Sequence, residues 1–124
     1  MEAKTRQEVF EILAGQMHNF GQGSFAVLIP GPSGLQKGAG GVDYPLDDKE
    51  KAIAQWAYDN SQIAGHGTDN LPAGKGYYVP IKTHRMTFGI MAFAFDSPEE
   101  VLTPENKELF ETMAFLGALA LERL

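Results

Sequence analysis

Cysteine is absent from this sequence of 124 residues. Its absence excludes disulfides, thiolate metal ligands, thiol nucleophiles and chromophores attached through a thioether bond. No apolar run approaches the roughly 18 residues of a membrane-spanning helix, and the N-terminus has no signal-peptide pattern. Basic residues are also few: 10 Lys and Arg stand against 16 Asp and Glu, and the formal net charge is -6. This balance argues against nucleic acid or an anionic membrane surface as the main partner.

What is present suffices for one folded domain. A length of 124 residues suits a single domain, and a hydrophobic content of 44% can fill a core. The 14 glycines gather mainly in residues 15–41 and 65–76, which marks those parts as rich in loops. No internal repeat is present.

Hydrophobic periodicity and turn residues predict helices and short strands. Asp47 or Asp48 begins the middle helix, and the spacing from Asp47 to Glu50 is that of a capping box. Thr103-Pro104-Glu105 begins the last helix with a cap, a proline at the first helical position and an acid in the first turn. The predicted elements are a helix over 4–20, a strand over 25–29, a weaker strand within 35–44, a helix over 47–58, strands over 77–82 and 87–95 joined by a turn at 83–85, a loop over 96–102 and a helix over 103–124.

The strand over 87–95 is apolar on both of its faces. One face carries Met91, Phe93 and Phe95, and the other carries Phe88, Ile90, Ala92 and Ala94. Because both faces must be covered, the pattern predicts a central strand, with helices on one side and a pocket-forming helix or loop on the other. The fold class expected from the residues is α+β.

The last helix carries two neighbouring apolar rows. One row is Leu109, Met113, Leu116 and Ala120, and the other is Phe110, Ala114, Gly117, Leu121 and Leu124. The second row has the four-and-three spacing of a coiled coil, so we expect it to contact a second copy of the chain while the first row covers the sheet. The alternative is one wide surface that faces the core. The helix reaches the last residue without a stop signal, which suggests a segment of a longer protein.

The segment from Ala64 to Pro72 is where a binding site is expected. Two glycines flank His66, and the three short polar side chains that follow can fix the shape of a loop by bonding to nearby backbone. Trp56, on the preceding helix, either lines this pocket or anchors its helix to the sheet, and anchoring is the commoner role. The candidate ligand-binding residues are Trp56, Gly65, His66, Gly67, Thr68, Asp69 and Tyr78.

Patterns for catalysis or metal binding are weak. His66, Asp69 and His84 do not match the spacing of a zinc motif, so a structural or solvent-facing His66 is favoured. The run that begins Gly65-His66-Gly67 starts like a dinucleotide fingerprint, but Asn70 stands where the third glycine belongs. Neither a nucleophile elbow nor a paired acid and base stands out. The residues therefore identify no catalytic group, metal site or cofactor.

From Glu50 to Leu124 the sequence resembles the cytoplasmic GAF domain of KdpD-type sensor histidine kinases, which control potassium uptake. The middle run is specific, because the family has a pattern close to Ala-Gly-Arg-Gly-Thr-Asp-Thr-Leu-Pro. Here His66 and Asn70 replace the arginine and the second threonine, and a neutral histidine weakens any anion site that the arginine would form. The matching runs are Ala52-Ile53-Ala54-Gln55-Trp56, Ala64-Gly65-His66-Gly67-Thr68-Asp69-Asn70-Leu71-Pro72, Tyr78-Val79-Pro80-Ile81, Phe88-Gly89-Ile90-Met91-Ala92 and Ala118-Leu119-Ala120-Leu121-Glu122-Arg123.

The resemblance implies a GAF-like fold with α/β/α layers. In it a central antiparallel sheet has the N- and C-terminal helices on one face and the pocket, where one exists, on the other. The resemblance also implies a cytoplasmic place in a membrane-bound two-component kinase, between the membrane segments and the helices that carry the phosphorylated histidine. A homodimer through the terminal helices, a role in osmosensing and an unknown small molecule are implied in the same way. The chain lacks the ATP-binding glycine boxes of such kinases, so it is not expected to be the transferase itself.

Three functions stay open at this point. In the leading one, the domain senses or relays a signal through a small shift between the helices at 4–20 and 103–124. In the second, it is a ligand-free spacer that dimerises, and a pocket filled by Trp56, Tyr78 and Met91 would favour that reading. The third is a small stand-alone enzyme of GAF-like fold, which would need a measurable turnover.

Overall fold

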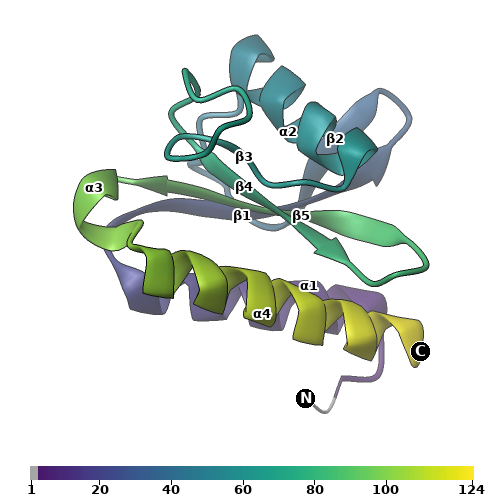
Figure 1. The fold of residues 1–124 in the computed structure, drawn as a ribbon. Helices are drawn as coiled ribbons and strands as arrows, with labels where there is room; N and C mark the ends of the chain where they lie inside the picture. The colour runs from purple at the N-terminus through teal and green to yellow at the C-terminus, as the bar shows by residue number, and fades with distance from the viewer. Residues whose placement is uncertain (1–2) are drawn as a thin grey trace.

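Five antiparallel strands form one sheet with helices on both of its faces (Figure 1). The computed structural model describes residues 3–124. The strand order is β2-β1-β5-β4-β3, with α1 and α4 on one face and α2 on the other, which is the layered α+β arrangement expected. In chain order the elements are α1 (Arg6–Met17), the 3-10 turn η1 (His18–Phe20), β1 (Gly23–Gly31), β2 (Gly34–Gly40), α2 (Asp48–Asn60), β3 (Ala64–Gly65), β4 (Tyr77–Lys82), β5 (Thr87–Phe95), α3 (Pro98–Val101) and α4 (Pro104–Glu122).

Side-chain caps begin the three long helices. Thr5 caps α1, Asp47 caps α2 and Thr103 caps α4, each by accepting a hydrogen bond from the backbone N–H three residues later. Pro104 occupies the first turn of α4, where its missing N–H leaves no intrahelical bond unmade. At α2 only half of the predicted capping box forms, because the side chain of Glu50 turns away from the helix terminus and into the protein interior.

The strands follow the sequence pattern closely. β4 and β5 have the predicted bounds, and β2 begins one residue before the range 35–44 in which a weaker strand is expected. The sequence pattern does not indicate the two-residue strand β3. β1 is longer than predicted and continues through Pro30, which is paired with Leu35 of β2. The loop predicted over 96–102 contains the short helix α3, because a proline and two acids after Ser97 form a favourable helix start.

β5 lies at the centre of the sheet, as its two apolar faces predict. Met91, Phe93 and Phe95 pack in the core shared with α1 and α4, whereas Ile90 and Ala92 pack in the core shared with α2. All five side chains are buried. The sheet therefore has a separate hydrophobic core on each face.

Phe88 is the exception on β5. Strict alternation assigns it to the α2 side, yet its ring belongs to the core beside α1 and α4. The register explains the difference: Ile81 pairs with Gly89 and Lys82 pairs with Thr87, so Phe88 is an extra residue on β5. A bulge of this kind shifts the alternation by one residue and moves the side chain to the other face.

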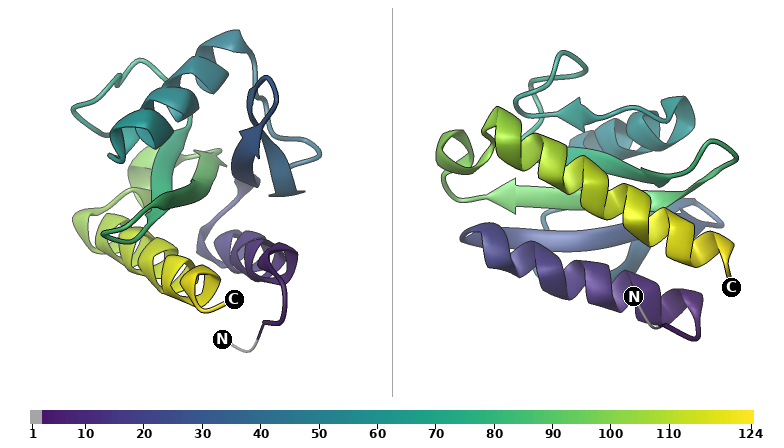
Figure 2. Two further views of the ribbon diagram at one scale, coloured as in Figure 1. Left: turned by 90° about the vertical axis from the view of Figure 1, so that its right-hand side faces the viewer. Right: turned by 60° about the horizontal axis from the view of Figure 1, so that its bottom comes forward.

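α1 and α4 lie side by side under one face of the sheet (Figure 2). The ring of Phe110 on α4 is fully buried, with its centroid 4.5 Å from that of Phe93 and 4.9 Å from that of Phe20. Gly117 lets the two helices approach, because a Cβ at this position would lie 2.7 Å from Cδ1 of Leu13 on α1. The layer is therefore closely packed by rings and small residues.

The apolar row of α4 that the sequence pattern assigned to a second chain faces the domain's own sheet. That assignment of contact residues is wrong, because four of the five residues are buried in the chain's own core. A row with one aromatic ring and several small residues fits closely against the sheet and α1, which a row of leucines does not. The buried members are Phe110, Ala114, Gly117 and Leu121, and the exposed member is Leu124.

Three of the four residues in the other row of α4 lie on the outer side of the helix, whereas Ala120 is buried. The exposed fraction is 43% for Leu109 and 55% for Leu116, and Met113 between them is half-buried. Together with Ile12 and Phe20 near α1, Met113 and Leu116 line a hollow of about 640 Å³ between the two helices. We call the surface formed by Ile12, Phe20, Leu109, Met113 and Leu116 the outer helical face.

One edge of the sheet is short of a partner. β3 has two residues and pairs only with the first two residues of β4, Tyr77 and Tyr78. In the described residues no strand neighbours the rest of that edge of β4. Pro80 lies on this stretch and has no N–H to offer, which discourages the addition of a further strand.

Candidate functional site

Two glycines set the backbone of the loop between β3 and β4. Gly65 has φ +100°, and a Cβ there would lie 2.1 Å from the carbonyl oxygen of Gly76. Gly67 has φ +77°. L side chains rarely adopt these conformations, so the two glycines in the Gly-His-Gly run are required by backbone geometry.

Thr68 and Asn70 then close the loop on itself. The hydroxyl oxygen of Thr68 lies 2.8 Å from the carbonyl oxygen of Gly65 and 2.9 Å from that of Asn70, and it accepts a hydrogen bond from Asn70 N at 3.1 Å. The amide nitrogen Nδ2 of Asn70 donates to the carbonyl oxygen of Ile63 at 3.0 Å. The polar atoms of Thr68 are therefore used to hold the loop, as short polar side chains in turns commonly are.

The same loop also contacts the α3–α4 region. Nε2 of His66 lies 3.2 Å from a carboxylate oxygen of Glu99 on α3. Nζ of Lys107 on α4 donates to the carbonyl oxygen of Gly67 at 2.5 Å. Because Glu99 is largely exposed, its contact with His66 contributes little to stability. The contacts nevertheless place the loop against the first turns of α4.

Glu50 is the buried charged group of this site. Its exposed fraction is 2%, and its carboxylate accepts hydrogen bonds from Lys75 N at 3.1 Å and from Gly76 N at 2.9 Å. The hydroxyl of Tyr78 donates to the same carboxylate at 2.7 Å, and the hydroxyl of Tyr44 donates to that of Tyr78 at 2.8 Å. We call Glu50, Tyr78 and Tyr44 the buried polar network.

The protonation of the tyrosines is consistent with this arrangement. Burial is the first cause that raises the pKa of Tyr78 and of Tyr44 above the ordinary value for a phenol, and the nearby charge of Glu50 raises both further. Both hydroxyls therefore stay protonated near neutral pH and remain donors. A carboxylate that loses its hydration on burial needs such donors, and here three of them surround it.

Gly74 and Gly76 make room for the network. A Cβ on Gly76 would lie 2.3 Å from the hydroxyl oxygen of Tyr44 and 2.5 Å from that of Tyr78. A Cβ on Gly74 would lie 2.6 Å from Cδ1 of Ile53 on α2. The space between α2 and the sheet is therefore filled by the chain itself.

Sequence reasoning missed Glu50, although a signal was present. With Ile53, Ala54 and Ala57 it occupies helix positions spaced by three, one and three residues, which share one face of α2. All four side chains are buried. An acid on the apolar face of a helix predicts a buried carboxylate with dedicated donors, whereas the capping-box spacing places the same side chain at the helix terminus.

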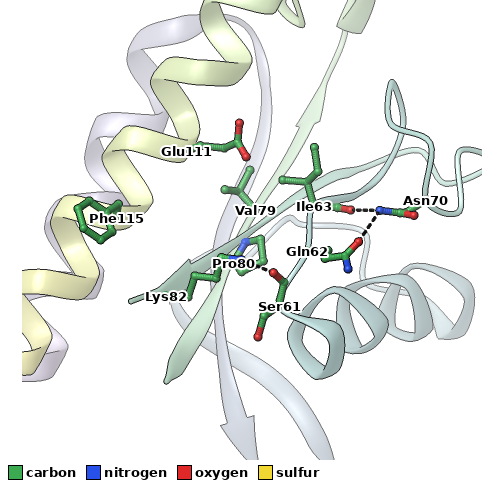
Figure 3. Close-up of a pocket in the computed structure, with 9 residues that line it drawn as sticks. All are labelled: Ser61, Gln62, Ile63, Asn70, Val79, Pro80, Lys82, Glu111 and Phe115. Atoms are coloured by element: carbon green, nitrogen blue, oxygen red, sulfur yellow. Dashed lines mark hydrogen bonds between the residues drawn. The ribbon is translucent and has the colours of Figure 1, made fainter. Parts of the chain in front are cut away.

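A pocket of about 300 Å³ lies beside the free edge of β4 (Figure 3). It is bounded by α4, by β4 and by the segment that follows α2. In Figure 3 the carboxylate of Glu111 reaches toward Val79 and Ile63, and the amides of Gln62 and Asn70 lie at one side. The lining residues are Ser61, Gln62, Ile63, Asn70, Val79, Pro80, Lys82, Glu111 and Phe115.

A tyrosine near this pocket has an unsatisfied hydroxyl. Tyr77 is 1% exposed, and among residues 3–124 its hydroxyl has no hydrogen-bond partner. Burial, and after it the negative charge of Glu111, raise the pKa of Tyr77 above its ordinary value. Glu111, whose charge contributes to this raised pKa, is one of the residues that line the pocket.

The GAF domain profile matches residues 10–123 of the chain. The chain belongs to the GAF domain family. It is 40% identical over 80 residues to the sensor protein KdpD of Escherichia coli K12, and 34% identical over 78 residues to the sensor protein KdpD of Clostridium acetobutylicum. The first match covers 64% of this chain and 9% of the relative, and the second covers 63% and 8%.

Solved structures agree with this assignment. The crystal structure of the GAF domain of the potassium sensor histidine kinase KdpD from Escherichia coli has a TM-score of 0.82 and 30% identity, and the match covers 98% of this chain and 85% of that chain. The second GAF domain of DevS from Mycobacterium smegmatis has a TM-score of 0.72 at 16% identity, covering 96% and 94%. The resemblance to KdpD-type GAF domains expected from the sequence is confirmed, and this GAF domain spans less than a tenth of the curated relatives' length.

In this GAF domain the predicted site residues do not come together around one cavity. Tyr78 belongs to the buried polar network, Trp56 is half-buried beside the α2 core, and Asp69 is exposed. Met91, expected to help fill a pocket with Trp56 and Tyr78, lies in the core on the opposite face of the sheet. Gly65, His66, Gly67 and Thr68 form the loop described above, and none of the seven candidates lines the pocket in Figure 3.

The histidines of the GAF domain are also separate. His66 lies in the loop after β3, whereas His84 lies in the hairpin between β4 and β5. Within the described part of the chain, no three histidine, aspartate or glutamate side chains are placed so that they could share a metal ion. In the same residues, no helix has the length and apolar character needed to cross a membrane.

Proposed function

We propose that this GAF domain is a signal-relay module of a KdpD-type sensor histidine kinase, on the cytoplasmic side of the inner membrane. The observation that carries this proposal is the pairing of α1 and α4, which lie side by side under the sheet in a domain similar to the KdpD GAF domain. A small change in the packing of α4 against α1 would alter the relative position of the two helices. The domain acts in this proposal without a cofactor and without catalysis of its own.

The loop between β3 and β4 supplies a route from the far face of the sheet to α4. The buried polar network attaches this loop to α2 through Lys75 N and Gly76 N. At the other end of the loop, the carbonyl of Gly67 accepts a hydrogen bond from Lys107 of α4. A movement of α2 or of the loop would therefore reach α4 through direct contacts.

The proposed signal relay can be tested in a chimeric kinase whose autophosphorylation is measured. In the KdpD protein of Escherichia coli, the matching domain is replaced by this chain, and autophosphorylation is followed at low and high potassium. We expect a potassium-dependent response that Lys107→Ala reduces and Lys49→Ala, on exposed α2 surface, leaves intact. A chimera with normal basal phosphorylation and no response to potassium would contradict the relay.

We further propose that two copies associate through the outer helical face. Leu109 and Leu116 are exposed on α4, and Ile12 and Met113 are half-buried beside them. The same apolar surface on two copies can pair about a two-fold axis and bury these side chains in a bundle of four helices. The contact residues are those of the outward row of α4, in place of the row expected from the sequence.

Dimerisation is tested by sedimentation of the isolated domain. Leu116→Glu places a charge in the middle of the outer helical face and should shift the domain to the monomer. Ala52→Glu is the matched control, because Ala52 is exposed on α2 and far in sequence from this face. An unsubstituted domain that is monomeric at every concentration, or a Leu116→Glu variant that remains dimeric, would refute this contact.

A second candidate function is small-molecule sensing at the pocket in Figure 3. It is favoured by Glu111 and Phe115, through which a bound molecule would touch α4 directly. A panel of nucleotides and cyclic dinucleotides, followed by amide NMR, tests this site. Saturable shifts at Gln62 and Asn70 that Glu111→Gln abolishes would support it, and shifts confined to other parts of the domain would exclude it.

A further inference from the structure

The chain contains three arginines, and all of them line one hollow. Arg6 begins α1, Arg85 lies in the hairpin between β4 and β5, and Arg123 follows the end of α4. Figure 1 shows these three parts of the chain together at one end of the molecule, near the label for the C-terminus. The hollow has a volume of about 570 Å³. Residues that are far apart in the sequence are thus gathered by the fold.

The three guanidinium groups lack carboxylate partners in the described part of the chain. Between residues 3 and 124 the one ion pair within 4 Å joins His66 to Glu99, which belongs to another region. Glu122 also lines the hollow, but its carboxylate accepts a hydrogen bond from the hydroxyl of Thr83. Three cationic side chains therefore face one side-chain carboxylate, which already has a donor.

Two of the arginines are held in place by neighbouring groups. The guanidinium carbon of Arg6 lies 5.4 Å from the centroid of the Phe88 ring, within the range of a cation–π contact. Nε of Arg123 donates to the carbonyl oxygen of Leu119 at 3.4 Å. Both contacts leave the terminal nitrogens of these guanidinium groups for another ligand. The site is thus partly organised before anything binds.

The charge of the hollow contrasts with that of the chain. The formal net charge of the protein is -6, yet this lining contains three arginines and one glutamate. In an acidic protein, most small anions are repelled from the surface as a whole, so a local positive hollow concentrates them at one place.

We propose that Arg6, Arg85 and Arg123 form a binding site for a phosphate-bearing anion. Each guanidinium presents two parallel N–H groups that match the oxygens of a phosphate. Bound phosphate would connect the start of α1, the β4–β5 hairpin and the end of α4. The same chemistry fits a free phosphate compound or the headgroup of an anionic phospholipid, and the apolar side chain of Met86, 47% exposed at the rim, can contact either.

The first experiment titrates the domain with inorganic pyrophosphate at constant ionic strength. Guanidinium Nε–H and backbone NMR signals of Arg6, Arg85 and Arg123 report binding. We expect saturable shifts at all three, and about tenfold weaker binding in Arg85→Gln, which removes one charge-assisted contact from an exposed side chain. Lys49→Gln is the matched control, because it removes the same charge from exposed α2 and should bind as the unsubstituted domain does.

The second arm distinguishes the source of the phosphate. Vesicles of phosphatidylglycerol and phosphatidylcholine are compared with vesicles of phosphatidylcholine alone in a sedimentation assay. Binding of the anionic vesicles that Arg85→Gln weakens and Lys49→Gln retains assigns the site to a headgroup, while pyrophosphate binding without vesicle binding assigns it to a free compound. The proposal is overturned if neither probe binds, or if Lys49→Gln weakens binding as much as Arg85→Gln does.

Discussion

Between α2 and the sheet, the interior contains a carboxylate and two tyrosine hydroxyls, whereas between the sheet and the terminal helices it contains mainly rings and aliphatic chains. Hydrogen bonds of a buried charge are directional and are lost when partners move by a fraction of a bond length. Apolar contacts are not directional, so neighbouring helices can shift slightly and still bury the same surface. This difference favours α1 and α4 as the helices that slide against each other in a relay, whereas α2 and the loop between β3 and β4 move as one unit.

The loop between β3 and β4 is fixed by the same buried carboxylate that lies between α2 and the sheet. Glu50 accepts hydrogen bonds from two consecutive backbone N–H groups of the loop, at Lys75 and Gly76. A loop fixed in this way transmits a displacement of α2 instead of absorbing it.

Phe110→Ala should lower the free energy of unfolding by about 4 kcal/mol, because it removes a fully buried ring from the centre of the apolar side. Urea unfolding measures the change. Phe115→Ala is the matched control on the same helix, since this ring is 42% exposed and should cost much less. Equal losses in the two variants would mean that the apolar core does not hold α4 in place.

Glu50→Gln should lower the free energy of unfolding by about 3 kcal/mol, although the two side chains have nearly the same shape. The amide has one acceptor oxygen where the carboxylate has two, so a buried donor is left without a partner. Urea unfolding of Glu105→Gln, an exposed acid at the start of α4, supplies the control for loss of charge. If both variants unfold alike, the buried polar network does not stabilise the α2 side.

Gly76→Ala should cost about 2 kcal/mol, because its methyl group would overlap the hydroxyls of Tyr44 and Tyr78. Gly117→Ala should cost less, although its methyl group would lie only 2.7 Å from Cδ1 of Leu13, because the end of a leucine can move aside and alanine favours the helix. Thermal and urea unfolding of both variants tests the order. If Gly117→Ala cost more than Gly76→Ala, the α2 side of the sheet would accommodate an added methyl group more easily than the side of α1 and α4.

Tyr44→Phe should cost about 1 kcal/mol near neutral pH, since it removes one hydrogen bond at the end of the network. The pKa of Tyr44 is raised above 10.0 in the folded chain, mainly by burial. Stability from this group is therefore full below the unfolded pKa and is lost as pH rises above it. Urea unfolding between neutral and strongly alkaline pH should show a shallower alkaline loss in Tyr44→Phe, and an unchanged slope would contradict the raised pKa.

Local patterns were enough to predict much of the fold. The cap at Thr103, the bounds of β4 and β5 and the two apolar faces of β5 depend on neighbouring residues, so they can be read from a window of the sequence. The family run around Gly65 and Thr68 was likewise visible, because the turn geometry needs those residue types. The same run does not reveal that the polar atoms of Thr68 are used within the loop.

The candidate site was harder to predict, because its parts lie far apart in the chain. Glu50 and Gly76 are 26 residues apart, and no local pattern indicates that the carboxylate meets this backbone N–H. The bulge at Phe88 depends on the register with β4, which a single strand does not specify. The meeting of Arg6 with Arg85 and Arg123 depends on how both terminal helices dock on the sheet.

Local residue patterns dictate the three long helices, four of the five strands, the central position of β5 and the family, because periodicity, caps and turn residues act over a few neighbouring positions. Which row of α4 faces the sheet depends on how the whole chain packs. Both rows are apolar, so hydrophobicity alone does not determine which row is buried. The shapes of the side chains determine it. Leu13 packs closely against Gly117, and the ring of Phe110 packs against that of Phe93. Leu116 therefore lies on the outer side of the helix.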